Sequence, residues 1–510
     1  MRGAQAMGTW ELASSSASSA QSWPSATLRR SHRHRLCHIT AAAANHAVRA
    51  HPPPPPPQTT AFGRCRRLRH RPRRSGASAA VDHACTASVV HAHGAAAAAA
   101  TPRTPLLAGR LSQDLVGVVA SRLLAGGDLL DYVRFRAVCA GWRSGTASPR
   151  GRGFADPRFH PRRWMMLPEG HCLHPGHPDL RGHARFLNLD TGAMVRARAP
   201  LLGEHCVIDS VDGLLLLLRD PDQDGAVRLL HPFTGDAVEL PPLGTLLLQL
   251  GSRLPMCPAP YMITRLARVV CASVSFTAGA IAITLWLDEV ARVAFATSQD
   301  RQWNVSSWEY PMICSSLSFQ GKLYMMGNPD SCYDSAHEVL QIDPPARDGA
   351  GTGDLVLPPP KLIAAIPAHK LVHPYSLVEC GSEILVLGRN DLSGSLDLVF
   401  RLADLVLQRF MPIRSIKGHT LFVEERSITV SSKVLSTVKG DNVVFVHEHS
   451  GRPYLAQYHL NSGSVSPAID DCSLYGNAQG PSCLVHYIFS CCILDRWSRG
   501  LIFRRNAESW

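Results

Sequence analysis

Short units of strand, glycine turn and strand recur through the C-terminal two thirds of the sequence, and this recurrence restricts the fold more than any other feature. Each unit joins two apolar runs through a turn, and the turns are centred on Gly213, Gly279, Gly321, Gly381 and Gly440. Successive centres are 66, 42, 60 and 59 residues apart. Strand-rich units at this spacing over about 340 residues are typical of radially arranged blades, because a sandwich is complete in far fewer residues. The pattern predicts an all-β propeller of about six or seven blades.

A second kind of turn follows other strands and also ends in glycine. It occurs in the segments LDTG, PFTG and LNSG, which end at Gly192, Gly235 and Gly463. Glycine permits the positive φ angle that tight hairpins need. We therefore expect a hairpin at each of these three positions.

Residues 269–287 need a separate test, because they form a run of 19 residues without a charge. A helix of this length would just span a bilayer. The run is rich in Val, Ile, Phe and Thr, however, and Thr277 and Gly279 mark a turn near its middle. Two strands of about eight residues joined by that turn are the better interpretation, so we expect no membrane partner.

The first fifth of the chain differs from the remainder in charge. Residues 1–110 contain 15 arginines, no lysine and two acidic residues, a net charge of +13 that leaves −1 for residues 111–510. The remainder therefore has no bulk charge that would attract nucleic acid. The proline and alanine runs at 52–57 and 95–100 cannot bury enough apolar surface to offset chain ordering, so residues 1–108 are predicted to be disordered.

Three interpretations of this extension stay open. Its arginine content and lack of acids are typical of a transit peptide for a chloroplast or mitochondrion. The arginine cluster at 64–74 is typical of a nuclear localisation signal. The third interpretation is a solvated extension without a targeting role, or an over-extended gene prediction. No secretory signal is expected, because the opening residues lack a continuous apolar run.

The cysteines and acidic residues give no sign of a catalytic or metal centre. The 15 cysteines are odd in number and include no CxxC pair, which is typical of a reducing compartment and argues against structural zinc. The nearest metal-like cluster is His447-Glu448-His449, and on a strand Glu448 would point away from the two histidines. No nucleophile elbow, Walker lysine or kinase motif is present. We expect a protein without enzymatic activity, cofactor or metal.

From residue 111 to about residue 150 the apolar residues follow a helical period. Leu115, Val118, Val119 and Leu123 recur at steps of three and four residues, and Asp128 can cap a second helix. A unit of about forty residues is marginal by itself. Its exposed apolar side chains are better covered by a partner helix than by water.

Residues 111–144 resemble an F-box, and we assign this all-α, three-helix domain to residues 109–150. The family pattern has an aliphatic helix face, a central aspartate–leucine pair and a closing Arg-x-Val-Cys followed by Trp-Arg. The matching positions are Leu111, Asp114, Leu115, Val119, Leu123, Asp128, Leu129, Arg136, Val138, Cys139, Trp142 and Arg143. The family's proline after the first leucine is Ser112 here. A serine can still cap the helix, so we expect weakened rather than abolished docking.

The resemblance implies that this unit binds the Skp-type adaptor of a cullin ubiquitin ligase. The residues implied to contact the adaptor are Leu111, Asp114, Leu115, Val119, Leu123, Val138, Cys139 and Trp142. The alternative is that they only pack the three helices against one another. We favour the interface for the first leucines and Val119, and both interpretations stay open for the closing residues.

Residues 155–505 resemble the KIB-type β-propeller found behind F-boxes in plant proteins. The resemblance lies in the segment 156–164, the turn at 231–235, the strand pair around Gly321, and the segments 421–423 and 427–430. The family usually has asparagine where this chain has His231. That change should alter the hydrogen bonds of the turn without changing the fold.

Together the two resemblances imply the substrate-recognition subunit of an SCF-type E3 ubiquitin ligase, located in the nucleus or cytoplasm. The F-box would dock the adaptor, and through it a cullin. The propeller would bind a client protein that the sequence does not identify. The alternative is a stand-alone propeller for interaction or ligand sensing with a vestigial F-box, located in an organelle if the extension is a transit peptide.

Overall fold

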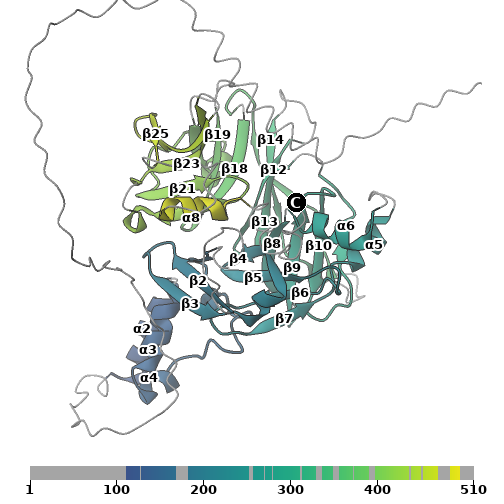
Figure 1. Ribbon diagram of the computed structural model, residues 1–510. Helices are drawn as coiled ribbons and strands as arrows, with labels where there is room; N and C mark the ends of the chain where they lie inside the picture. Colours follow the sequence, from purple (N-terminus) through teal and green to yellow (C-terminus); the bar gives the residue numbers. More distant parts are fainter. Residues whose placement is uncertain are drawn as a thin grey trace, which may run out of the picture. The chain divides into compact units, whose positions relative to one another are not determined.

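The computed structural model describes residues 111–126, 128–167, 182–251, 257–268, 270–277, 279–310, 313–328, 336–347, 355–371, 373–389, 397–435, 438–449, 452–468 and 483–493. The predicted disorder of residues 1–108 and the nuclear localisation cluster lie outside these residues. The described chain begins with three helices and continues as a series of β-sheets (Figure 1).

The three helices begin at residues that satisfy their first amide groups. They are α2 (Gln113–Ala125), α3 (Leu129–Ala137) and α4 (Ala140–Ser144). The Leu115 amide donates a hydrogen bond to the Ser112 hydroxyl oxygen at 3.4 Å, so Ser112 caps α2. Asp128 caps α3, because its carboxylate accepts hydrogen bonds from the amides of Leu130 and Asp131. Both predicted caps are confirmed.

The β part contains six sheets of three to five strands, which are the blades of a propeller. Blade 1 contains β1 (Trp164–Met166), β2 (His183–Asn188) and β3 (Met194–Arg198); blade 2 contains β4 (His205–Val211), β5 (Leu214–Arg219), β6 (Val227–Leu230) and β7 (Ala237–Leu240); blade 3 contains β8 (Val270–Thr277), β9 (Ala280–Leu287), β10 (Arg292–Thr297) and β11 (Asn304–Val305). Blade 4 contains β12 (Ile313–Phe319), β13 (Lys322–Gly327), β14 (His337–Ile342) and β17 (Lys361–Ile366); blade 5 contains β18 (His373–Cys380), β19 (Glu383–Arg389) and β20 (Asp397–Arg401); blade 6 contains β21 (His419–Val423), β22 (Ser427–Ser431), β23 (Asn442–His449), β24 (Arg452–His459) and β25 (Val465–Pro467).

Shorter elements connect the blades. They are the 3-10 turns η1 (Pro157–Phe159), η2 (Pro200–Gly203) and η4 (Ser432–Val434), the helices α5 (Thr245–Leu250), α6 (Ala259–Leu266), α7 (Leu402–Val406) and α8 (Leu484–Cys491), and the two-stranded ribbon of β15 (Ala346–Arg347) and β16 (Leu355–Val356). The helices α5 to α8 are departures from the prediction of an all-β domain over residues 155–505.

Six clusters of buried apolar side chains connect the sheets in a closed cycle. Alternate side chains of a strand point to opposite faces, so one strand serves two clusters. In β5, Leu215 and Leu217 pack with blade 1, whereas Leu216 and its even-numbered neighbours pack with blade 3. Further clusters join blades 3 and 4, 4 and 5, 5 and 6, and finally 6 and 1. The cycle returns to its start, and the six blades fall within the predicted range of six or seven.

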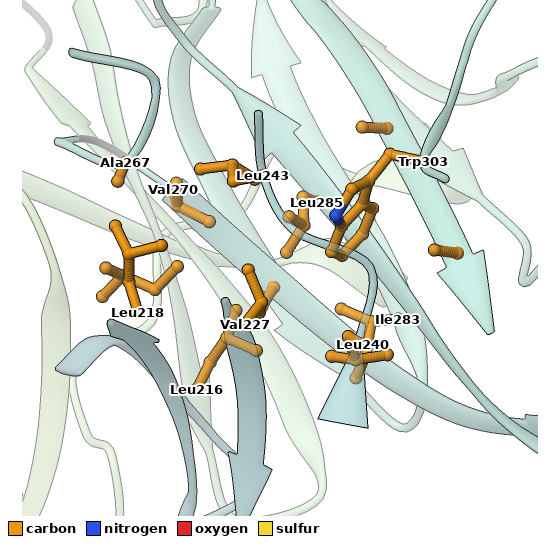
Figure 2. Packing of buried hydrophobic residues seen from close by; sticks show 14 of the residues in the cluster. Leu216, Leu218, Val227, Leu240, Leu243, Ala267, Val270, Ile283, Leu285 and Trp303 are labelled. Atoms are coloured by element: carbon orange, nitrogen blue, oxygen red, sulfur yellow. The ribbon is translucent and has the colours of Figure 1, made fainter. Parts of the chain in front are cut away.

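Figure 2 shows the cluster between blades 2 and 3. Leu216 and Val227 of blade 2 pack in the same cluster as Ile283 and Leu285 of blade 3, all without exposed surface. Trp303 is also fully buried there, and its indole nitrogen donates a hydrogen bond to the Pro241 carbonyl oxygen at 2.7 Å. A buried indole with a satisfied N–H group contributes a large apolar area at no polar cost. This residue therefore serves to hold two blades together.

The segment after blade 6 covers the joint between the last blade and the first. In α8, Ile488 and Phe489 are fully buried and pack with Phe422 of blade 6 and Leu187 of blade 1. Beyond the helix, the carbonyl oxygen of Cys492 accepts a hydrogen bond from the Arg426 amide at 2.9 Å. The ring is thus closed by side chains from both ends of the propeller sequence.

The predicted glycine turns are confirmed at most positions and wrong at one. Gly213, Gly279, Gly321 and Gly381 have positive φ angles and lie between paired strands. The three glycines of the second turn type also have positive φ. Gly440 does not form a hairpin, because β23 pairs in parallel with β21. A Cβ atom at this glycine would lie 2.7 Å from Gly418 Cα, so the position instead permits two loops to approach closely.

The uncharged segment 269–287 forms the predicted hairpin. Strands β8 and β9 pair antiparallel from Val270 opposite Leu287 to Thr277 opposite Ala280. In the described parts of the chain, no helix has the length and apolar character that crossing a membrane requires.

Candidate protein-docking surfaces

Large apolar side chains on one stripe of α2, and at Leu111 just before the helix, are exposed to solvent. The exposed fractions are 41% for Leu111, 52% for Leu115, 47% for Val118 and 38% for Val119. Leu115, Val118 and Val119 share one face of α2, and Leu111 lies two residues before its first residue. An apolar stripe that nothing within the described chain covers is typical of a docking surface for a partner helix. We call these four residues the α2 stripe.

The remaining residues that were predicted to contact an adaptor are divided between surface and interior. Asp114 and Val138 are exposed, the latter by 53%. Leu123 is half-buried against the internal cluster of the helices. Cys139 is half-buried, and its sulfur accepts a hydrogen bond from the Trp142 amide at 3.4 Å, which caps α4. Trp142 stacks on a neighbouring ring inside the unit, so for these last two residues the structure favours a packing role.

The opposite face of the helices packs inward on the chain that leads to blade 1. Leu124, Leu129 and Tyr132 are buried in one cluster with Phe159 of η1. The Tyr132 hydroxyl donates a hydrogen bond to the Ala147 carbonyl oxygen at 2.7 Å. These buried residues therefore have their partners within this chain, whereas the α2 stripe and Val133 of α3 face solvent.

His231 connects the same η1 segment to blade 2. Its Nε2 lies 3.0 Å from the Phe159 carbonyl oxygen, and its Nδ1 accepts hydrogen bonds from the amides of Phe233 and Thr234. An imidazole that accepts at Nδ1 must carry its proton at Nε2 and donate it to Phe159. Burial lowers the pKa of His231, which favours this neutral form.

Blade 1 has the same turn with asparagine in the equivalent place. The Asn188 side-chain oxygen accepts from the amides of Asp190 and Thr191, each at 3.0 Å. In both turns the amide of the glycine four residues on donates to the carbonyl of the first residue. The expectation that His231 leaves the fold intact is confirmed. The expected change in hydrogen bonding is also present, because an imidazole nitrogen replaces the amide oxygen as acceptor and Nε2 adds a bond to Phe159.

The inner part of the propeller contains a buried ion pair between distant blades. Asp209 lies in an irregular part of β4 and is 4% exposed. One of its carboxylate oxygens pairs with the Arg426 guanidinium from the turn between β21 and β22, and the other accepts from the Ala272 amide at 2.6 Å. Burial lowers the pKa of Arg426 to about 10, which still leaves it charged near neutral pH. The pair joins blades 2, 3 and 6 at the centre of the ring.

A second charged cluster lies where β18 ends. Burial, together with the negative charge of Asp212, raises the pKa of Glu379 to about 7. The charges of Arg163 and Arg162 act in the opposite direction. Both arginines have closer partners, since Arg163 binds Asp190 at 2.6 Å and Arg162 lies 3.4 Å from Asp212. Glu379 is therefore a carboxyl group that exchanges its proton near neutral pH.

No group of His, Cys, Asp and Glu side chains in the described segments has the arrangement of a metal site. The His447 ring packs edge-on against Phe445 and Tyr454, as an ordinary strand residue does.

A comparison with protein families assigns the β part of the chain. A family model described as the KIB1-4 β-propeller matches residues 186–466, more than half of the chain. The chain belongs to the KIB1-4 β-propeller family. The KIB1-4 match begins within β2 and ends within β25, so it includes strands of all six blades but neither β1 nor α8. A comparison with curated proteins finds no match.

Several features of the KIB1-4 propeller and its helices escaped the sequence argument. Val118 follows the helical period in the sequence and belongs to the exposed stripe, but it was not among the residues predicted to contact the adaptor. The pairing of Arg426 with Asp209 joins residues more than two hundred positions apart and leaves no local signal. The groove lined by Arg143 and Arg150 gave no local signal either, because its lining comes from segments far apart in the sequence.

Proposed function

We propose that this protein is the substrate-recognition subunit of an SCF-type ubiquitin ligase, acting in the nucleus or cytoplasm. Its helical unit would act as an F-box and bind a Skp-type adaptor, which connects it to a cullin. The KIB1-4 propeller would bind the client protein. The chain itself would form and break no bonds, because its contribution is to raise the effective concentration of client lysines near the recruited conjugating enzyme.

The observation that carries this proposal is the α2 stripe. Four large apolar side chains, three on one face of α2 and Leu111 just before it, lie in solvent, while Leu124, Leu129 and Tyr132 of the same helices are buried. Burying a leucine or valine side chain in an interface is worth about 1.5–3 kcal/mol. A helix of an adaptor laid along the stripe would gain several such contributions. The order of F-box residues in the sequence supports this choice of partner.

The structure of the ring bears on how a client would be bound. The Arg426–Asp209 pair occupies the centre of the propeller, and the inner strands also carry a hydrogen bond from the Leu377 amide to the Ser315 hydroxyl oxygen and one between Ser376 and Ser427. These contacts tie neighbouring inner strands to one another. We therefore assign client binding to loops at the ends of the blades, which is where propellers and other scaffolds present variable segments.

Co-purification with the adaptor tests the proposal. The full chain and its Leu115→Asp/Val119→Asp variant are each expressed with a tagged Skp-type adaptor. A matched control carries Leu248→Asp/Met411→Asp, two equally drastic changes at side chains that are 87% and 73% exposed on the propeller. Wild type and control should co-purify with the adaptor and the α2 variant should not. Adaptor binding by all three proteins would refute the proposal. So would the absence of binding by all three, if each protein melts cooperatively and is therefore folded.

A further inference from the structure

The segment that runs from within α3 to the start of blade 1 is the most basic part of residues 111–510. Residues 132–163 contain eight arginines and a single acidic residue, Asp156, a net charge of +7. Since residues 111–510 carry −1 in total, the rest of that region carries −8. The positive charge is thus concentrated in one short segment.

Most of these arginines are already neutralised or hydrogen-bonded within the chain. Arg134 pairs with Asp131 and Arg158 with Asp156. Arg162 and Arg163 pair with acidic residues of the blades. Arg136 donates to the carbonyl oxygens of Thr146 and Ala147, and so fixes the loop after α4.

The other three arginines, Arg143, Arg150 and Arg152, are exposed and have no ion pair with any residue that the structure describes. Two of them, Arg143 and Arg150, line an open groove of about 420 Å³. The floor of the groove is apolar and includes Leu129, Val133 and Phe233. No acidic side chain lines it.

The groove is held in shape by contacts on both sides. On one side, Arg136 and Tyr132 bind the carbonyl oxygens of the 146–147 loop. On the other, the Gly151 amide donates to the Asp236 carboxylate in the His231 turn at 2.9 Å. A ligand would therefore meet a rigid site and lose little free energy in ordering it.

We propose that this groove docks a short acidic segment of a partner protein, with an apolar side chain of that segment on the floor and its carboxylates on Arg143 and Arg150. Guanidinium groups bind carboxylates through paired, charge-assisted hydrogen bonds. The apolar floor distinguishes a peptide from other anions. An extended polyanion such as nucleic acid is disfavoured, because the rest of residues 111–510 carries a net charge of −8. This surface is separate from the α2 stripe and does not depend on the ubiquitin ligase role.

Fluorescence polarisation on the full chain tests the inference. The probe is a labelled degenerate pool of short peptides made of Asp, Glu, Leu and Phe, beside a pool with Asn and Gln in place of the acids. Wild type should bind the acidic pool at least about tenfold more tightly than the neutral pool, and added salt should weaken that binding. Equal binding of the two pools would overturn the proposal.

Variants locate the binding. Arg143→Glu/Arg150→Glu should weaken binding of the acidic pool by at least about tenfold. Val133→Ser should weaken it by a smaller factor, because it removes part of the apolar floor. The matched control is Arg409→Glu/Arg414→Glu, which reverses two exposed arginines after α7 and should leave binding unchanged. Equal losses in the two double variants would contradict the inference. Binding of duplex DNA or anionic vesicles through Arg143 and Arg150, without binding of the acidic pool, would also contradict it.

The α2 stripe variant separates this inference from the proposed function. Leu115→Asp/Val119→Asp should abolish adaptor binding and leave peptide binding intact, whereas Arg143→Glu/Arg150→Glu should have the opposite pattern.

Discussion

The Arg426 guanidinium pairs with the Asp209 carboxylate in the interior of the ring and so ties blade 6 to blade 2. The side chains are 21% and 5% exposed, respectively. Removal of one partner from a buried pair takes away much of what compensates the other charge, which costs about 3–5 kcal/mol. Arg426 also supplies the amide that binds the Cys492 carbonyl beyond α8. Side chain and backbone of this one residue therefore both contribute to closing the propeller.

We predict that Asp209→Ala lowers the free energy of unfolding by about 3 kcal/mol or more. Asp209→Ala/Arg426→Met should be less destabilised than the sum of its single variants, because neither charge is then left buried alone. Urea denaturation measures the free energy of unfolding of wild type, the two single variants and the double variant. Glu239→Gln is the control, since Glu239 pairs with Arg228 but its side chain is 77% exposed, and the loss there should be below about 1 kcal/mol. Additive losses at positions 209 and 426 would disprove the coupling.

A second prediction concerns Glu379 and pH. Its pKa is about 7 in the folded protein against an ordinary value of 4.5, so the folded state holds the proton more tightly than the unfolded chain. Stability therefore falls as pH rises between these two values, and the penalty is complete above them. Glu379→Gln should raise the free energy of unfolding at about pH 8 by up to about 3 kcal/mol and leave it unchanged at about pH 4. An equal gain at both values would show that titration is not its cause.

Substitutions of His231 test its hydrogen bonds. Asn188 makes the same turn in blade 1, so His231→Asn should cost only about 1 kcal/mol, chiefly the lost bond to Phe159. His231→Ala should cost about 2–3 kcal/mol, because it leaves two amides without their acceptor. Thermal melts of the three proteins give the order. A greater loss for asparagine than for alanine would contradict the equivalence of the two turns.

The lowered pKa of His231 predicts that the stability of the protein depends on pH. The folded state binds the proton less tightly than the unfolded chain, whose histidine has a pKa of 6.5. Stability from this residue is present above that value and is lost as pH falls towards the folded pKa. The His231→Asn variant should lack this loss. Parallel acid-induced unfolding curves for variant and wild type, below about pH 6, would rule out the contribution.

The closing helix provides a further prediction about stability. Phe489→Ala removes a fully buried ring from the joint between blades 6 and 1, which should cost about 3–5 kcal/mol. Leu248→Ala changes a side chain that is 87% exposed and should cost less than about 0.5 kcal/mol. Chemical denaturation compares the two. If both variants match wild type, α8 does not hold the ring together.

Local sequence signals predicted much of the fold, but they did not predict the long-range contacts that close the ring of blades. Turns at Gly213 and Gly381 and the caps at Ser112 and Asp128 follow from the conformations and hydrogen bonds of single residues, and the structure has them. The hairpin at Gly440 was wrong, because the glycine is needed for contact with another loop, which sequence spacing does not show. Helix α8 was not predicted for a related reason: its apolar residues pack against both blade 6 and blade 1, which are far apart in the sequence.

The candidate site divides in the same way. Helical periodicity places Leu111, Leu115 and Val119 on one face; the structure leaves all three exposed, although Leu111 lies just before α2. Periodicity did not separate Trp142 from Val138, which are half-buried and exposed respectively, because that difference depends on how the three helices pack. The groove beside Arg143 and Arg150 was beyond the sequence, because its floor combines α3 with a turn of blade 2 about a hundred residues away.

The affinity of the full chain for a purified Skp-type adaptor tests the central claim most directly. Titration by isothermal calorimetry should give a defined dissociation constant for wild type and for Leu248→Asp/Met411→Asp. Leu115→Asp/Val119→Asp should weaken binding by about a hundredfold or more, since two buried apolar contacts are replaced by buried charges. Equal affinities for the three proteins, or no heat of binding for folded wild type, would contradict the claim that the α2 stripe docks the adaptor.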